Sequence, residues 1–573
     1  MKTENKSHAE KLGLFSALYE NAKNAYSDTL SLFDKYMRQY RGSTEIDGSS
    51  VCATTVRNIT YEIVESQVSS DIPQPKVDSV FYTETRERNA QAIERLCRSA
   101  RASLPFDELN DLDERFTYIY GGSVWFVEWD DTVRTPGGIG DVKVHLISPR
   151  DFIPQPDVYT IEDMEYCFIR FTTTRAGLIE KYGIDEEKSL LAECESENGA
   201  VSSSDTVNLI LAFYKNENGD IGLYAFSGSL VLDDSPRYYK RKLRYCRSCG
   251  LPEGVCSCGT GEFKEEEIDF ELVGDPRGRE PYIKVPYYTP RRFPIVIRKN
   301  TSTEKCLLGQ SDCEYLRPEQ QAINKIESRI LEKLLRAGIT PIVPEDASIS
   351  LNNSVFGQLI KMKPGESASQ YGKVDTTPDI SQDIAEAGRL YDHAKRTLGI
   401  SDAFQGISES ANESGYARQL RISQASGRLE SKRRMKNTAY ASIDRLIFEL
   451  YLAFADERRA LSYKDGLGRV HEEAFSRFDF LEYDSLTGEW RYDSSYLFSI
   501  DTGSGNEYQR EALWQRNLEN LRSGTLGDVA SPETLYRYWQ AQERAHYPFA
   551  RDNVEYFKDI ISKGEPNELY AER

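Results

Sequence analysis

The pattern of apolar and polar residues predicts helices in six stretches of the chain. These stretches are residues 10–40, 79–103, 311–335, 381–398, 415–456 and 507–563, the last interrupted at 524–531. At 1.5 Å per residue, the helix predicted at 311–335 would be roughly 37 Å long. Ser381 and Gly399 are favourable capping residues, so they predict where the fourth helix begins and ends.

A second pattern, in which apolar and polar residues alternate, predicts strands. Strands are expected at residues 124–130, 141–147, 207–214, 221–226, 263–273 and 480–500. Asn218-Gly219 separates two of them and is a strong signal for a β-hairpin. Residues 110–300 are therefore expected to be mainly β with helical decoration, and the whole chain is expected to have a mixed α+β fold.

Composition narrows the class of protein. The chain has 573 residues, which suggests roughly four domain-sized units. Its 11% of aromatic residues favours packed cores over an acidic disordered chain. No apolar run approaches the ~18 residues of a membrane span, and the polar N-terminus does not resemble a signal peptide. We therefore expect a soluble, intracellularly made protein with no membrane partner.

The charge balance bears on nucleic-acid binding. Lys and Arg number 72, Asp and Glu number 92, and the net charge is -20. Tight non-specific binding to DNA requires many cations that neutralise phosphates, so the acidic balance argues against it. It remains compatible with a surface along which DNA slides.

The order of the predicted elements and three local segments carry a resemblance to a known family. The segments are Tyr120-Gly121-Gly122-Ser123 before the first strand, Ile147-Ser148-Pro149-Arg150 after the second, and Phe498-Ser499-Ile500-Asp501-Thr502-Gly503 before the last helices. In this order the chain resembles the portal proteins of tailed bacteriophages, which form the head–tail connector.

The resemblance implies a portal-like division of the chain. Its parts would be a wing (1–310), a first stem helix (311–337), a clip (338–378), a second stem helix (379–399), a tunnel loop (400–414), a long wing helix (415–456), returning wing strands (457–505), and a helical crown with a C-terminal tail (506–573). The wing would have a helical start and a β-rich core.

The function implied by the resemblance is mechanical, so no enzymatic activity is expected. Portal subunits form a ring, usually of twelve copies, at one vertex of the capsid, and double-stranded DNA passes through it. The terminase large subunit docks on the clip during packaging, and head–tail adaptor proteins replace it; capsid and scaffolding proteins are further partners. The protein would be assembled in the host cytoplasm and located in the virion. A ring also suits two amphipathic helices that need neighbours.

Four of the ten cysteines are crowded within thirteen residues: Cys246, Cys249, Cys256 and Cys258. Four thiolates at short spacing, with glycines at the bends, favour a structural zinc site around 244–260. The second pair has an unusual one-residue gap, so paired disulfides or exposed thiols remain alternatives. Because all four ligand positions would be filled by protein, such a zinc ion would be structural.

The segment after the fourth helix is small and acidic. The resemblance makes it the tunnel loop and implies a channel-facing set of residues: Asp402, Gln405, Gly406, Ser408, Glu409, Asn412 and Glu413. Such a lining would repel phosphates and let DNA slide. An ordinary surface loop would have much the same composition.

A basic stretch begins the long helix that follows. It contains Arg418, Arg421, Arg428, Lys432, Arg433, Arg434 and Lys436, with Glu430 as the one opposing charge. These cations could face DNA, or they could pair with acidic residues of adjacent subunits. The net charge favours intersubunit pairing.

Two alternative functions remain. Asp501-Thr502-Gly503 resembles the catalytic turn of aspartic proteases, in which two aspartates share a proton, so a homodimer would be required. The cysteine cluster also allows a zinc-containing nucleic-acid-binding protein, which the net charge disfavours. The sequence lacks a Gly-x4-Gly-Lys-Ser/Thr phosphate loop, so we do not expect it to be its own ATPase.

Overall fold

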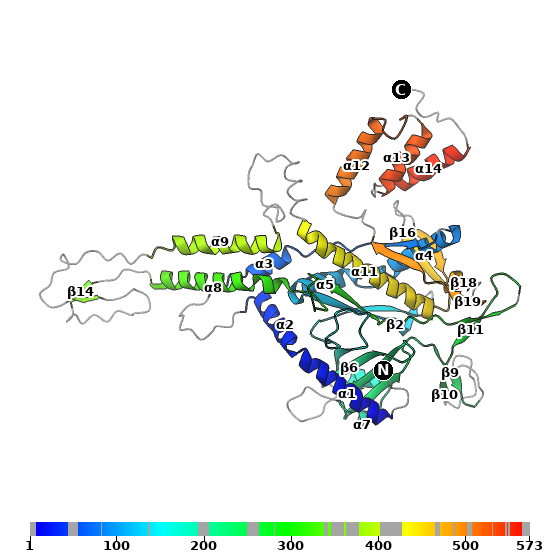
Figure 1. Ribbon diagram of the computed structural model, residues 1–573, viewed down its shortest axis with the longest axis horizontal. Coiled ribbons are helices and arrows are strands. Elements are labelled where there is room, and N and C mark those ends of the chain that lie inside the picture. The colour runs from blue at the N-terminus through cyan, green and yellow to red at the C-terminus, as the bar shows by residue number, and fades with distance from the viewer. Residues whose placement is uncertain are drawn as a thin grey trace.

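The chain is a mixed α+β protein with three parts, as the computed structural model shows (Figure 1). A body holds most of the sheets, a stalk consists of two long helices, and three C-terminal helices form a separate group. The structure describes residues 7–43, 55–81, 83–135, 138–192, 206–248, 263–279, 281–336, 342–344, 360–362, 378–400, 427–464, 470–484, 488–500, 507–529, 531–544, 547 and 550–563. The predicted fold class is confirmed at this coarse level.

The largest sheet of the body has five antiparallel strands in the order β4-β5-β6-β7-β8. The strands are β4 (Phe152–Pro154), β5 (Tyr166–Thr174), β6 (Thr206–Lys215), β7 (Ile221–Ser227) and β8 (Leu230–Ser235). The predicted β6–β7 hairpin is confirmed, and Gly219 in its turn has a φ of +81°, a conformation that favours glycine.

A second sheet has the order β13-β2-β3 and carries the central tryptophan of the core. It consists of β2 (Gly122–Thr135), β3 (Gly138–Ile147) and β13 (Ile295–Lys299). The predicted strand pair at 124–147 is therefore confirmed, and β13 completes the sheet from a distant part of the sequence.

Small antiparallel pairs surround these sheets. They are β1 (Pro75–Ser79) with β20 (Tyr496–Ile500), β9 (Lys242–Cys246) with β10 (Phe263–Glu267), β11 (Phe270–Val273) with β12 (Ile283–Pro286), β16 (Arg459–Lys464) with β17 (Val470–Phe475), and β18 (Leu481–Asp484) with β19 (Glu489–Tyr492). A 3-10 turn, η2 (Arg477–Phe480), leads into β18.

The helices of the body cover the sheets. They are α1 (His8–Ala25), α2 (Ser27–Tyr40), α3 (Ile59–Glu65), α4 (Glu84–Ala102), α5 (Phe106–Tyr120), α6 (Arg175–Tyr182), α7 (Glu186–Ser189) and α11 (Gly427–Phe454). Trp125 of β2 is fully buried, with the ring of Phe106 5.9 Å away and that of Tyr440 5.6 Å away. The core thus joins α5, β2 and α11, which are far apart in the sequence.

The stalk and the C-terminal helices complete the fold. The stalk consists of α8 (Asp312–Arg336) and α9 (Ser381–Leu398), and the parallel pair β14 (Ile342–Pro344) and β15 (Ile360–Met362) belongs to the chain between them. The C-terminal helices are α12 (Glu507–Arg522), α13 (Pro532–Arg544) and α14 (Ala550–Lys563). They have a small apolar cluster of their own and stand apart from the body in Figure 1.

Two predicted helices differ from the structure near the N-terminus. The stretch 10–40 is interrupted at Tyr26, because its first half packs on the five-stranded sheet and its second half packs with α5 and α8. The stretch 79–103 becomes helical only at Glu84, after a strand that pairs with β20 and after Thr83, whose side chain caps the helix.

Residues 106–120 form α5, a helix that the sequence pattern did not locate within the region expected to be mainly β with helical decoration; its apolar face is buried against α11 and β2. Two other local predictions need correction. Residues 263–273 form two strands, since each pairs with a different partner. Ser381 is the first helical residue rather than the N-cap, and Asp379 Oδ1 accepts its amide hydrogen at 2.9 Å, whereas Gly399 ends the helix as predicted.

Several predictions concern residues outside the described ranges. These are the zinc ligands Cys249, Cys256 and Cys258, the channel-facing residues Asp402, Gln405, Gly406, Ser408, Glu409, Asn412 and Glu413, the cations Arg418 and Arg421, most of the clip, and the turn at Asp501. They stay predictions.

Candidate functional site

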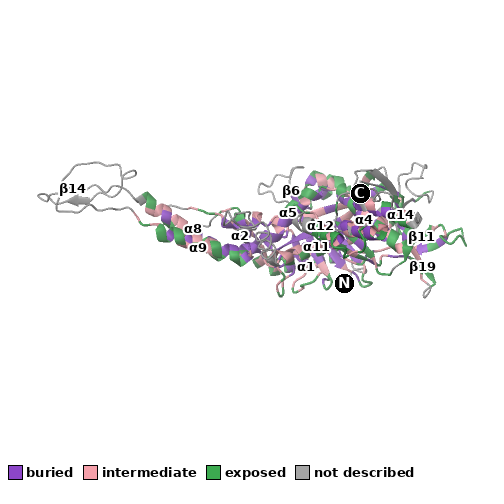
Figure 2. Cartoon of the chain, turned by 90° about the horizontal axis from the view of Figure 1, so that it is seen from above, coloured by how far each residue is buried: buried purple, intermediate pink, exposed green. Residues whose placement is uncertain are grey.

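The stalk extends far from the body as an antiparallel pair of helices (Figures 1 and 2). Its register is shown by two contacts: Glu319 Oε1 lies 2.8 Å from His393 Nδ1, and Lys333 donates to Asp383 at 2.5 Å. Figure 2 shows far more buried residues in the body than along the stalk. The stalk is therefore a protrusion with a narrow interior.

The apolar interior of the stalk is concentrated near the body. It consists of Leu316, Ile323, Ala394 and Leu398, packed with Ile59, Ile63 and Ile400. Because α3 of the body supplies two of these residues, the base of the stalk shares its core with the body. Ile400, which was assigned to the start of the tunnel loop, is buried in this cluster.

Farther from the body, charged side chains join the two helices. Asp383 accepts hydrogen bonds from Lys333 and Arg329, and the bond from Lys333 is the main reason why the pKa of Asp383 lies below its usual value. Arg329 is 57% exposed, so solvent screens this pair and its contribution to stability is small.

The far end of the stalk presents apolar side chains to solvent. The exposed fractions are 49% for Leu334, 69% for Leu335 and 55% for Ile384. No described part of the chain covers them. Exposed apolar residues grouped at the end of a protrusion are typical of a surface that contacts another molecule.

The base of the stalk is anchored by a buried carboxylate. Asp312, the first residue of α8, has no exposed surface and accepts hydrogen bonds from Asn300 Nδ2 (2.8 Å), Gln67 Nε2 (3.0 Å) and Lys432 Nζ (2.6 Å). A negative charge is favourable at a helix N-terminus, and the three donors supply the hydrogen bonds that the buried carboxylate needs. Lys432 thereby ties the start of α8 to α11.

A second buried charge cluster lies among α5, β13 and α11. Arg298 donates to Asp113 and, at 2.8 Å, to Glu114, while Lys436 Nζ lies 3.0 Å from Glu114. Burial alone would raise the pKa of Glu114, but Arg298 and Lys436 reverse this and hold it below its usual value. Trp125 Nε1 also donates to Asp113 at 2.9 Å, so the cluster is joined to the core.

A close backbone approach fixes the segment that leads into α8. Gly121 ends α5 with a φ of +90°, and a Cβ added there would lie 2.6 Å from the carbonyl oxygen of Gly309. Asn300 donates its amide hydrogen to Gly121 O at 3.0 Å. Glycine is required here because the conformation is left-handed and the space is filled by backbone.

The predicted basic stretch is only partly described, and its described members have partners within the same chain. Lys432 binds Asp312, whereas Arg433 and Arg434 lie 3.5 Å from Glu430 of their own helix. The side chain of Arg428 is not described. Lys432 therefore faces the base of its own stalk, and whether Arg433 and Arg434 also meet DNA or a neighbouring subunit stays a prediction.

Of the predicted zinc ligands, Cys246 alone lies in the described residues. It is buried at the end of β9, where it pairs with Phe263 at the start of β10. The other three cysteines belong to the segment between these two residues. The strands thus bring the two ends of the cysteine-rich segment together, while the ligand geometry itself lies outside the described ranges.

The anchor residues Asp312, Asp113, Glu114 and Arg298 were missed by sequence reasoning. Isolated charges in or beside apolar stretches resemble ordinary surface residues, and only the packing of α5, α8 and α11 shows that they are buried. The local sequence carries no signal for Asp113-Glu114, because the stretch resembles an ordinary charged helix surface that also contains Asp107, Glu108, Asp111 and Arg115.

Compared with models of protein families and with curated protein sequences, the chain matches none. Among the described helices, none has an apolar stretch suited to crossing a membrane. Function must therefore be inferred from the stalk and its anchor.

Proposed function

We propose that the protein is a portal-type subunit that assembles into a ring and forms a DNA conduit at one vertex of a phage capsid. The observation that carries the proposal is the stalk: two antiparallel helices project from an α+β body, with a small β pair between them in the sequence and apolar side chains exposed at its far end. The ordered resemblance to portal proteins gives this arrangement its function.

A ring would stabilise a stalk that consists of only two helices. Leu334, Leu335 and Ile384 are exposed in a single chain, and burial of such side chains stabilises an assembly by roughly 25 cal/mol per Å² of apolar surface. Contacts between two different faces of identical subunits close into a ring when the rotation between them is suitable. Neighbouring stalks would therefore cover each other's apolar residues.

The buried anchor gives the proposed subunit mechanical stiffness. Lys432 joins α11 to the first residue of α8, and Lys436 joins α11 to Glu114. A force applied to the stalk by the packaging motor or by moving DNA would thus be transmitted into the core. The proposed role of the chain is therefore to bear force, and no catalytic activity is assigned to it.

The remaining parts of the proposal follow from the resemblance. The clip would bind the terminase large subunit and later the head–tail adaptor proteins, and capsid and scaffolding proteins would surround the wing. The acidic segment 402–413 would face the channel, and a structural zinc ion would hold the segment after β9. The ring, usually of twelve copies, would be assembled in the host cytoplasm and retained in the virion.

The proposal is tested by imaging the purified protein and measuring its mass. Negative-stain microscopy is expected to show rings with a central hole, and mass photometry a mass many times the 65.4 kDa of one chain. Leu335→Glu places a charge at the exposed stalk tip and is expected to shift the protein towards monomers without unfolding it, because the side chain is 69% exposed. A compact dimer with no hole would contradict the proposal.

A matched control separates the stalk from other exposed apolar sites. Leu191 is 54% exposed in the body, so Leu191→Glu introduces the same charge at a similar exposure. It is expected to leave the rings intact. Equal loss of rings in both variants would mean that the stalk has no special part in assembly.

A further inference from the structure

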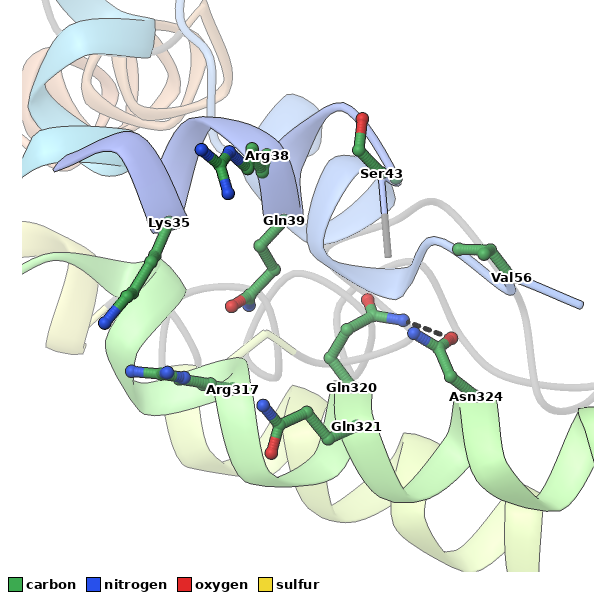
Figure 3. Close-up of a pocket in the computed structure, with 10 residues that line it drawn as sticks. Lys35, Arg38, Gln39, Ser43, Val56, Arg317, Gln320, Gln321 and Asn324 are labelled. Carbon is green, nitrogen blue, oxygen red and sulfur yellow. Dashed lines mark hydrogen bonds between the residues drawn. The ribbon is translucent and has the colours of Figure 1, made fainter. Parts of the chain in front are cut away.

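A cavity of about 140 Å³ lies between α2 and α8, where the stalk meets the body (Figure 3). Three of its ten lining residues are cationic, Lys35, Arg38 and Arg317, and four carry side-chain amides. None of the ten is acidic. This composition is unusual for a chain with a net charge of -20, and it points to a negatively charged ligand.

One wall of the cavity is held rigidly. Gln320 is 4% exposed, accepts hydrogen bonds from the Thr60 amide and hydroxyl at 3.0 Å, and donates to Arg57 O at 2.7 Å. It also donates to Asn324 Oδ1 at 2.9 Å. Because the oxygen of Asn324 is engaged in this way, its amide nitrogen is left as a hydrogen-bond donor at the cavity.

The cations lie opposite each other across the gap. In Figure 3, Lys35 extends from α2 towards Arg317 on α8. Among the described residues, neither has a carboxylate within ion-pair distance. Glu314, one turn before Arg317, instead accepts a hydrogen bond from Tyr36 at 3.0 Å. Like charges directed towards one space repel each other, and a bound anion would remove this cost.

We infer that this cavity binds a phosphate group. Phosphate presents several acceptor oxygens in different directions, and the cavity offers the ammonium of Lys35, the guanidinium of Arg317 and the amide of Asn324 from two helices. The group could come from free inorganic phosphate or from the backbone of DNA. The inference does not depend on ring formation, since all the residues belong to one chain.

The first experiment measures phosphate binding by the full chain. Inorganic phosphate is titrated calorimetrically at constant ionic strength, with chloride as the reference anion. Arg317→Gln and Lys35→Gln are each expected to weaken binding about tenfold, as befits loss of one charge-assisted contact. Lys325→Gln is the control, because Lys325 is an exposed cation of the same helix outside the cavity.

The second experiment uses a short DNA duplex over a range of salt concentrations. If the ligand is the DNA backbone, each cavity variant lowers the salt dependence of binding by about one counterion relative to Lys325→Gln. A loss confined to inorganic phosphate identifies the free anion as the ligand. Thermal unfolding without phosphate verifies that each variant is folded. If both cavity variants bind phosphate and DNA as the control does, the inference is wrong.

Discussion

The body and the stalk use charged residues in opposite ways. In the body, Arg298 is 2% exposed and meets Asp113 and Glu114 inside the core. In the stalk, Arg329 is 57% exposed and meets Asp383 beside solvent. Both are contacts between arginine and carboxylate, yet only the first is isolated from water.

This difference follows from the amount of apolar surface available to each part. The body surrounds its charges with a large core, so each buried charge must keep its partners. The stalk has two helices and a small cluster near its base, so the cations Arg329 and Lys333 that cover Asp383 stay in contact with solvent and the pairs contribute little. In the proposed ring, neighbouring stalks would supply the apolar contacts that a single stalk lacks.

The largest expected effect comes from removing the buried arginine. Arg298→Met leaves the buried Asp113 without its arginine and leaves Glu114 with Lys436 alone, so the free energy of unfolding should fall by about 3–5 kcal/mol. Arg329→Met in the stalk is the matched change and should cost less than about 1 kcal/mol. Denaturant unfolding followed by tryptophan fluorescence measures both. Similar losses in the two variants would remove the distinction between body and stalk.

A second comparison uses two glycines. Gly121→Ala adds a Cβ against backbone at a positive φ, so it should destabilise the protein by about 2 kcal/mol or more. Gly388→Ala lies within α9, where the added Cβ meets nothing within 4 Å beyond the adjacent backbone of its own helix, so it should stabilise the stalk by roughly 0.5–1 kcal/mol. Unfolding measures the first effect, and hydrogen exchange of the stalk amides measures the second. A Gly121→Ala variant as stable as the parent protein would contradict the close approach.

The smallest expected effect is a contrast in pH dependence. Burial raises the pKa of Asp444, which pairs with Arg101 in the body, to about 6. Its contribution to stability is therefore complete below the ordinary Asp pKa of about 4 and is lost as pH rises through about 6. From pH 5 to 7, Asp444→Asn should gain roughly 1 kcal/mol relative to the parent protein.

Asp383 of the stalk should behave in the opposite way. Its pKa is lowered, so its contribution is present above pH 4 and is lost as the pH falls below that value. Asp383→Asn should therefore differ least from the parent in acid. Unfolding measured from about pH 3 to about pH 7 tests both carboxylates, and the same direction of change with pH for the two variants would contradict the assignment.

The long regular elements were predictable because their signals are local. The period of apolar residues located α8 and α9 almost to the residue, and the Asn218-Gly219 turn located the β6–β7 hairpin. Helix α5 was missed because its burial depends on α11, which follows more than 300 residues later. The break at Tyr26 was missed because continuous helical spacing does not show that two halves pack on different partners.

The sequence by itself determined the mixed α+β class, the two long helices of the stalk and the β6–β7 hairpin of the body, because spacing and turn residues act over a few positions. Tertiary structure alone decided that Asp312, Asp113 and Arg298 are buried, that Lys432 faces the stalk of its own chain, and that Lys35 and Arg317 share a cavity. The physical reason is that burial and charge pairing depend on which distant segments meet, and this information is absent from local periodicity.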